Sequence, residues 1–195
     1  MRYINLLAGA VVAASSGTAF ADTILVPSEY GSIQSAIDVA EEGDVVSVDA
    51  GIYYEIIDFL GKGITVSSAS GDPSGTFIDG GVSSGSVVKF TTAETESAVL
   101  DGFTIRNGSS QDGGGIYMIG SSPTIQNCII SSNSASRFGG GIYADGSTLS
   151  LSNVHITGNI SVKTGAGIYL VGCEGFISDG TFSGNSGTSG SAIYY

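Results

Sequence analysis

The chain has 195 residues, a length typical of one domain, and its 18 Asp and Glu outnumber its 6 Lys and Arg to give a net charge of −12. A charge this negative argues against nucleic acid and anionic membrane surfaces as partners. Glycine occupies 31 positions without a collagen-like period, which indicates a fold with many turns rather than a fibre.

The first 21 residues are typical of an export signal. Arg2 is followed by an apolar stretch from Ile4 to Ala14, and Ala19 to Ala21 form a small-residue cleavage site. The apolar stretch is too short for a membrane-spanning helix. We therefore expect cleavage after Ala21, no transmembrane segment afterwards, and a secreted or cell-surface domain over residues 22–195.

A short helix is predicted within an N-terminal cap over residues 22–44. Four apolar residues between Ser32 and Glu42 share one helical face: Ile33, Ala36, Ile37 and Ala40. Ser32 is the expected N-cap, and Gly43 is the expected stop. Such a helix would cover the open end of a stack of coils. Less regular strands are expected next, at Val45–Val48, Ile64–Val66, Thr76–Asp79, Val87–Phe90 and Val99–Leu100.

From about residue 98 to 195 the sequence repeats with a period close to 26 residues. The motif Gly-Gly-Gly-Ile-Tyr ending at Tyr117 returns, with variations, ending at Tyr143, Tyr169 and Tyr194, in steps of 26, 26 and 25. Two further series share the period: Asp101, Asn127, Asn153 and Asp179, and Asn133, Asn159 and Asn185. Three series in one register predict stacked coils.

Each period contains three short strand-like runs, for example Gly115–Ile119, Thr124–Gln126 and Cys128–Ser131. No segment between them is long enough for a helix, so βαβ units are excluded. The predicted fold is an all-β, right-handed, single-stranded parallel β-helix with three strands per coil. The series from Asp101 to Asp179 is expected to form a bend with positive φ, which Asn and Asp tolerate best after Gly.

Two motifs resemble the repeat of the chlamydial polymorphic outer membrane proteins. They are Gly114-Gly115-Ile116 with its copies, and Phe182-Ser183-Gly184-Asn185. The segment from Ser28 to Gly81 is similar to the opening of pectin-lyase-like β-helix proteins. These resemblances imply the β-helix fold. They do not choose among adhesins, autotransporter passengers and polysaccharide lyases, which share it.

The candidate ligand-binding surface is a column of outward-facing tyrosines on one strand of each coil: Tyr117, Tyr143, Tyr169 and Tyr194. Gln111, Arg137 and Lys163 follow the same period on the preceding turn. Phenol rings beside cations suit the recognition of polysaccharides, including acidic ones. The alternative is that stacked tyrosines only stabilise an exposed sheet.

Catalysis is the competing interpretation, as a lyase or hydrolase of acidic glycans. His155 is the single histidine, and the paired carboxylates of glycoside hydrolases are not recognisable in the repeat. Asp112 and Asp145 are isolated in their series. We therefore expect no catalytic residues, no metal site and no cofactor, and the leading prediction is a non-catalytic extracellular recognition or adhesion module.

Two further expectations concern the cysteines and the C-terminal end. Cys128 and Cys173 fall at different places in the repeat and are predicted to be unpaired. Tyr195 falls within a strand that would open another coil, so the end of the stack is expected to dock onto a partner or to continue in a longer structural protein.

Overall fold

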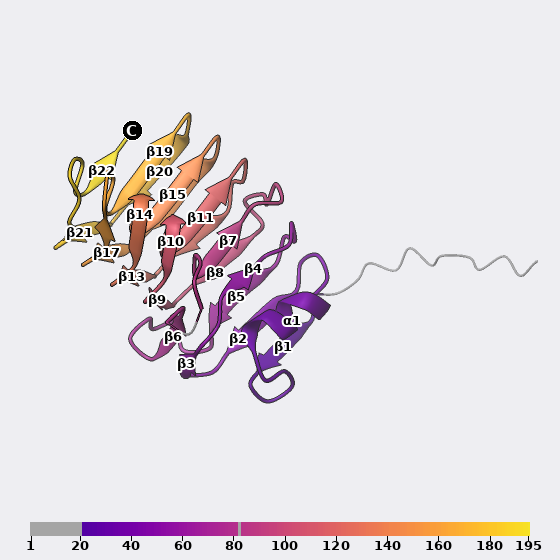
Figure 1. The fold of residues 1–195 in the computed structure, drawn as a ribbon. Coiled ribbons are helices and arrows are strands. Elements are labelled where there is room, and N and C mark those ends of the chain that lie inside the picture. The colour runs from indigo at the N-terminus through magenta and orange to yellow at the C-terminus, as the bar shows by residue number, and fades with distance from the viewer. Residues whose placement is uncertain (1–20, 82) are drawn as a thin grey trace, which may run out of the picture.

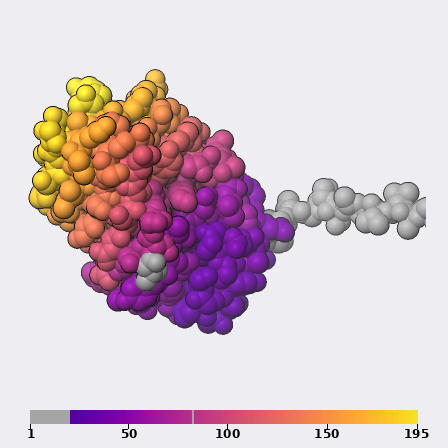
Figure 2. Space-filling model, in the orientation of Figure 1, coloured from indigo at the N-terminus to yellow at the C-terminus, as the bar shows by residue number. Residues whose placement is uncertain are grey.

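The computed structural model describes residues 21–81 and 83–195. Strands stack in successive coils from the N-terminal end, indigo in Figure 1, to the C-terminal end, in yellow. The space-filling view shows the coils following one another along the body in chain order (Figure 2). Apart from Ala21, the predicted export signal lies outside the described residues.

The N-terminal end consists of β1 (Thr23–Val26) and α1 (Ile33–Val39). The predicted N-cap is confirmed, because the Ser32 hydroxyl accepts a hydrogen bond from the Ser35 amide at 3.2 Å. The helix ends at Val39, before the predicted stop at Gly43. Lys62 Nζ lies 2.7–2.9 Å from the carbonyl oxygens of Ile37, Asp38 and Ala40 and so satisfies the end of the helix from the next coil.

Three main parallel sheets run the length of the stack. Sheet A contains β1, β2 (Val45–Val48), β5 (Thr65–Ser68), β8 (Val99–Asp101), β12 (Thr124–Gln126), β16 (Thr148–Ser152) and β20 (Glu174–Ser178). Sheet B contains β3 (Gly51–Tyr53), β6 (Thr76–Asp79), β9 (Thr104–Arg106), β13 (Ile129–Ser131), β17 (His155–Thr157) and β21 (Thr181–Ser183). Sheet C contains β4 (Ile57–Asp58), β7 (Val88–Phe90), β11 (Ile116–Ile119), β15 (Ile142–Asp145), β19 (Ile168–Val171) and β22 (Ile193–Tyr194). The three predicted strands per coil are therefore confirmed.

A fourth, shorter sheet was not predicted. Sheet D contains β10 (Ser109–Asp112), β14 (Ser134–Phe138) and β18 (Ile160–Ser161), between sheets B and C along the chain. These segments are short and rich in Ser, without an apolar alternation typical of a strand. They pair because the neighbouring coils hold equivalent backbone positions side by side.

The register places equivalent residues of successive coils beside one another. Ile142 pairs with Ile116 on one side and with Ile168 on the other, and all three are fully buried. Side chains alternate between the interior and the surface along each strand. The interior is consequently a continuous apolar column that extends through all coils.

The bend between sheets A and B follows the predicted series at three of its four positions. Asn127, Asn153 and Asp179 have φ values of 50°, 53° and 52°. The prediction for Asp101 is wrong: it is a strand residue that pairs with Gln126, and Gly102 takes the bend with φ of 79°. The step from Asp101 to its true partner is 25 residues, because that coil is one residue shorter. Asp101 still accepts a 2.8 Å hydrogen bond from the Asn127 side chain.

The second asparagine series forms an internal ladder after sheet B. Asn159 is fully buried, and its Oδ1 accepts from the backbone and side-chain amides of Asn133, both at 3.0 Å. Its Nδ2 donates to the Ile130 carbonyl at 2.8 Å. Asn185 repeats these contacts one coil later. Each asparagine thus binds two coils together inside the core.

Cys128 and Cys173 are both free thiols, as predicted. Burial raises the pKa of the Cys128 thiol to about 12. A thiol with so high a pKa carries little thiolate and is chemically inert, so its role is packing.

Candidate binding surface on sheet C

The four predicted tyrosines form one stacked column on the outer face of sheet C. The ring centroids of Tyr117 and Tyr143 are 5.3 Å apart, those of Tyr143 and Tyr169 are 5.7 Å apart, and those of Tyr169 and Tyr194 are 5.2 Å apart. The interplanar angles are 13°, 6° and 1°. The parallel strands of sheet C impose this spacing.

Stacking decides which part of each ring meets solvent. The faces of Tyr143 and Tyr169 are covered by their neighbours, so these rings present edges and hydroxyl groups. Desolvation, followed by the nearby Asp145 and Asp112 carboxylates, raises the pKa of Tyr143 to about 12. The Tyr143 hydroxyl therefore stays protonated at neutral pH, and the phenol hydroxyls of the column can donate and accept hydrogen bonds.

Phe138 extends the aromatic surface toward sheet D. Its ring centroid lies 4.5 Å from that of Tyr169, with Arg137 and Lys163 at 5.7 Å and 5.4 Å from the Phe138 centroid. Sequence reasoning missed Phe138. It lies 26 residues after Asp112 and occupies the same register position, but the residue types differ, so the repeat gave no matching side chain to recognise.

Arg137 is not a free cation. Its guanidinium forms an ion pair with Asp112 of the preceding coil, and the Asp112 carboxylate also accepts the Phe138 amide at 3.2 Å. The side chain of Asp112 is only 7% exposed, whereas that of Arg137 is 43% exposed. The hydrogen bond to Asp112 raises the pKa of Arg137. Asp112 is thus isolated in its series, because Phe138 occupies the equivalent position, but it pairs with Arg137.

Lys89 continues the column toward the N-terminal end, where the sequence predicted a strand, Val87–Phe90, but no binding residue. In the register of sheet C it pairs with Tyr117 on one side and with Asp58 on the other. A surface hollow of about 240 Å³ lies here, lined by Lys89, Gln111, Asp112 and Tyr117 among others. Within residues 21–81 and 83–195, neither Lys89 nor Lys163 forms an ion pair.

A family model for the right-handed β-helix region matches residues 52–195. The chain belongs to the right-handed β-helix family. No curated protein and no solved structure gives a significant match. The family assignment establishes the fold of this β-helix and leaves its ligand open.

His155 and Asp79 have local partners on sheet B. His155 lies on sheet B, where its Nδ1 is 2.7 Å from the Thr181 hydroxyl. Asp79 binds Arg106 at 2.7 Å and also the Asn107 side chain.

Among the described residues, no group of three or more His, Cys, Asp or Glu is arranged to hold a metal ion. The same residues contain no helix long and apolar enough to cross a membrane.

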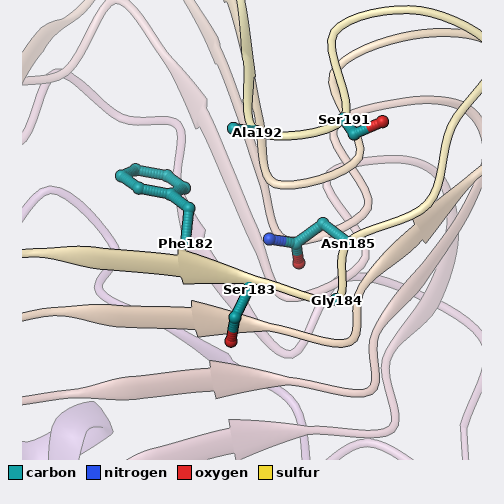
Figure 3. Close-up of a pocket in the computed structure, with 6 residues that line it drawn as sticks. All are labelled: Phe182, Ser183, Gly184, Asn185, Ser191 and Ala192. Atoms are coloured by element: carbon teal, nitrogen blue, oxygen red, sulfur yellow. The ribbon is translucent and has the colours of Figure 1, made fainter.

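The last coil exposes the interior of the β-helix. Figure 3 shows Phe182 and the Asn185 side chain beside a hollow of about 110 Å³, whose lining includes Ala192. A second hollow of about 260 Å³ lies over Leu170 and Ile177. Apolar positions that are buried in the central coils therefore meet solvent here.

Proposed function

We propose that this β-helix is a secreted, non-catalytic recognition or adhesion module that binds an acidic polysaccharide along sheet C. The observation that carries the proposal is the placement of the cations. The chain has a net charge of −12 and only 6 Lys and Arg, yet Lys89, Arg137 and Lys163 all flank the tyrosine column. Lys62 is held by the end of α1 and Arg106 by Asp79.

The chemistry of the column suits a chain of acidic sugars. Lysine and arginine bind carboxylates and sulfates, and neutral phenol hydroxyls bind sugar hydroxyls. The covered faces of Tyr143 and Tyr169 direct contact to the hydroxyl edges, while Tyr194, 41% exposed at the end of the column, retains an open face. A ligand that contacts several coils gains affinity from each repeated contact.

An extracellular location is part of the proposal. It is supported by the export signal expected over residues 1–21 and by the resemblance of Gly114-Gly115-Ile116 and Phe182-Ser183-Gly184-Asn185 to the chlamydial outer membrane protein repeat. Sequencing the N-terminus of the protein recovered after export tests this part. A mature N-terminus at Asp22 supports it, and retention inside the cell contradicts it.

The binding test uses the full chain with polygalacturonate, in parallel with and without Ca²⁺, and scores both binding and newly formed chain ends. We expect binding that weakens as salt is added, because the contacts are electrostatic, and no new ends. Lys89→Gln with Lys163→Gln should weaken binding at least about tenfold, equivalent to 1.4 kcal/mol.

Arg106→Gln is the control for either lysine variant made singly, since it also removes one positive charge, but from sheet B. An equal loss in this control would mean that binding reflects overall charge and not the column. Unsaturated or reducing ends would make the chain a polysaccharide lyase or hydrolase. Absence of binding to every acidic glycan tested would overturn the proposal.

A structural role is the second candidate, favoured by the exposed interior of the last coil. In this role another β-helical coil, from the same chain or a partner, would cover Leu170, Ile177 and Phe182. Sedimentation of the full chain over a range of concentrations tests the partner form. Self-association that Phe182→Asp abolishes would support it, and a monomer at all concentrations would contradict association between copies.

A further inference from the structure

A second groove lies on sheet A, around the corner from the tyrosine column. Its volume is about 580 Å³, within the range of small-molecule binding sites. The loop that joins β7 to β8 forms one side of the groove, where Thr95 and Glu96 line it, and β12, β16 and β20 form the floor. The groove is independent of sheet C and of the function proposed for it.

The loop is anchored rather than free. The Glu94 side chain, 2% exposed, accepts hydrogen bonds from the Gly61 amide at 2.8 Å, the Thr92 amide at 2.9 Å and the Ser121 hydroxyl at 2.8 Å. Thr124 of the floor donates to the Glu96 carbonyl at 3.2 Å. The groove is therefore formed before a ligand arrives, which lowers the entropic cost of binding.

The floor combines hydroxyl groups with one aromatic ring. Thr124, Ser150 and Phe176 occupy one register position on successive strands, so their side chains form a single outward column. Phe176 is 61% exposed, although polar residues precede it in the column. Ser122, Thr148 and Ser150 have hydroxyls that make no hydrogen bond within the described part of the chain. An exposed ring followed by unpaired hydroxyls is a surface suited to a pyranose ring.

The charge of the groove defines the class of sugar. Its lining contains Glu94 and Glu96 and no Lys or Arg, and Glu174 is the register partner of Thr148. The Glu94 carboxylate is occupied by the bonds that anchor the loop, while Glu96 is exposed and available to accept sugar hydroxyls. These carboxylates would repel an acidic sugar. We infer that this groove binds a neutral oligosaccharide. One sugar ring would stack against Phe176, and the adjacent sugar rings would lie over the hydroxyls of β12 and β16.

The test is calorimetric titration of the full chain with neutral gluco-oligosaccharides of β-1,4, β-1,3 and α-1,4 linkage, and with oligogalacturonate as the acidic counterpart. We expect at least one neutral probe to bind. Phe176→Ser should weaken that binding about tenfold or more, since stacking on the ring is lost. Ser150→Gln, which fills the floor, should also weaken it, and circular dichroism verifies that both variants fold.

Tyr54→Ser is the matched control, because Tyr54 is also 61% exposed and lies outside the groove. Lys89→Gln distinguishes the two surfaces: it should weaken oligogalacturonate binding and leave the neutral probe unaffected. The inference is overturned if no neutral probe binds. It is equally overturned if the neutral probe binds Phe176→Ser as tightly as the parent chain, or if Lys89→Gln abolishes its binding.

Discussion

The apolar interior of this β-helix is covered at its N-terminal end and partly exposed to solvent at its C-terminal end. At the N-terminal end, α1 buries Ile33, Ala36 and Ile37 against the first coils, and all three are fully excluded from solvent. At the C-terminal end, Phe182 and Ile193 occupy equivalent core columns but remain partly exposed. Stability in a stack of coils comes mainly from contacts with the neighbouring coil. A given side chain should therefore contribute less to stability near the open end.

The asparagine ladder should show the largest difference. Asn159→Ala would remove three hydrogen bonds in a dry interior, at about 1 kcal/mol each, and leave the Asn133 backbone amide unpaired, at about a further 1–3 kcal/mol; the Asn133 side chain keeps its bond to the Ile105 carbonyl. We expect a total loss of roughly 3–6 kcal/mol in the free energy of unfolding, measured with urea. Asn185→Ala should cost less than half as much, because water reaches the last coil. Equal losses would show that the open end is not solvated.

The second-largest loss of stability is expected from substitutions in the helix α1 that caps the N-terminal end. Ile37 is fully buried beneath α1, and Ile37→Ala removes this packing at an expected cost of about 2–5 kcal/mol. Val39, in the same helix but 48% exposed, provides the control, and Val39→Ala should change stability by less than about 0.5 kcal/mol. A small effect of Ile37→Ala on urea unfolding would mean that the cap is dispensable.

Substitutions in the tyrosine column should lower stability by less, and again the loss should be smaller at the open C-terminal end. Tyr143 stacks on a ring at each side, whereas Tyr194 stacks only on Tyr169. Each aromatic pair contributes about 0.5–1.5 kcal/mol beyond area burial. Tyr143→Ser should therefore lower the free energy of unfolding more than Tyr194→Ser. The opposite order in thermal unfolding would show that stacking does not stabilise sheet C.

The smallest effect at neutral pH concerns ionisation of the column. The pKa of Tyr143 is raised in the folded state to about 12 from the ordinary value of 10.0. The unfolded chain therefore releases this proton first, so the stabilisation is complete below pH 10 and is lost as the pH rises toward 12. Tyr143→Phe should reduce the loss of stability over this range. A phenolate that titrates at its ordinary pKa, followed by ultraviolet difference spectra, would contradict the assignment.

The regular coils were predictable because recurring residues in the sequence show which positions align in successive coils. Tyr117, Tyr143 and Tyr169 recur at one interval, and that interval is the length of one coil. The prediction failed where one coil departs from the period, as at Asp101, since a one-residue deletion shifts the alignment without changing residue types. It also missed the early end of α1, because Lys62 lies 22–25 residues away from the carbonyls it binds.

The candidate site was predictable only as a column. The outward placement of the tyrosines follows from strand alternation, but their mutual stacking depends on side-chain angles that a pattern does not encode. Lys89 and Phe138 share register positions with residues of other types, so no series contained them. The groove on sheet A depends on a loop of irregular length, and its anchor Glu94 binds residues from two other coils.

The asparagine ladder has a direction along the chain. Asn159 and Asn185 each donate the side-chain amide to a carbonyl of the coil before and accept the amides of the asparagine before. Each new coil thus supplies the acceptor for the buried amides of the asparagine before it, and its own asparagine amides are in turn accepted by the coil that follows. Growth of the β-helix can proceed in the order in which the polypeptide emerges, with each finished coil serving as the template for the next.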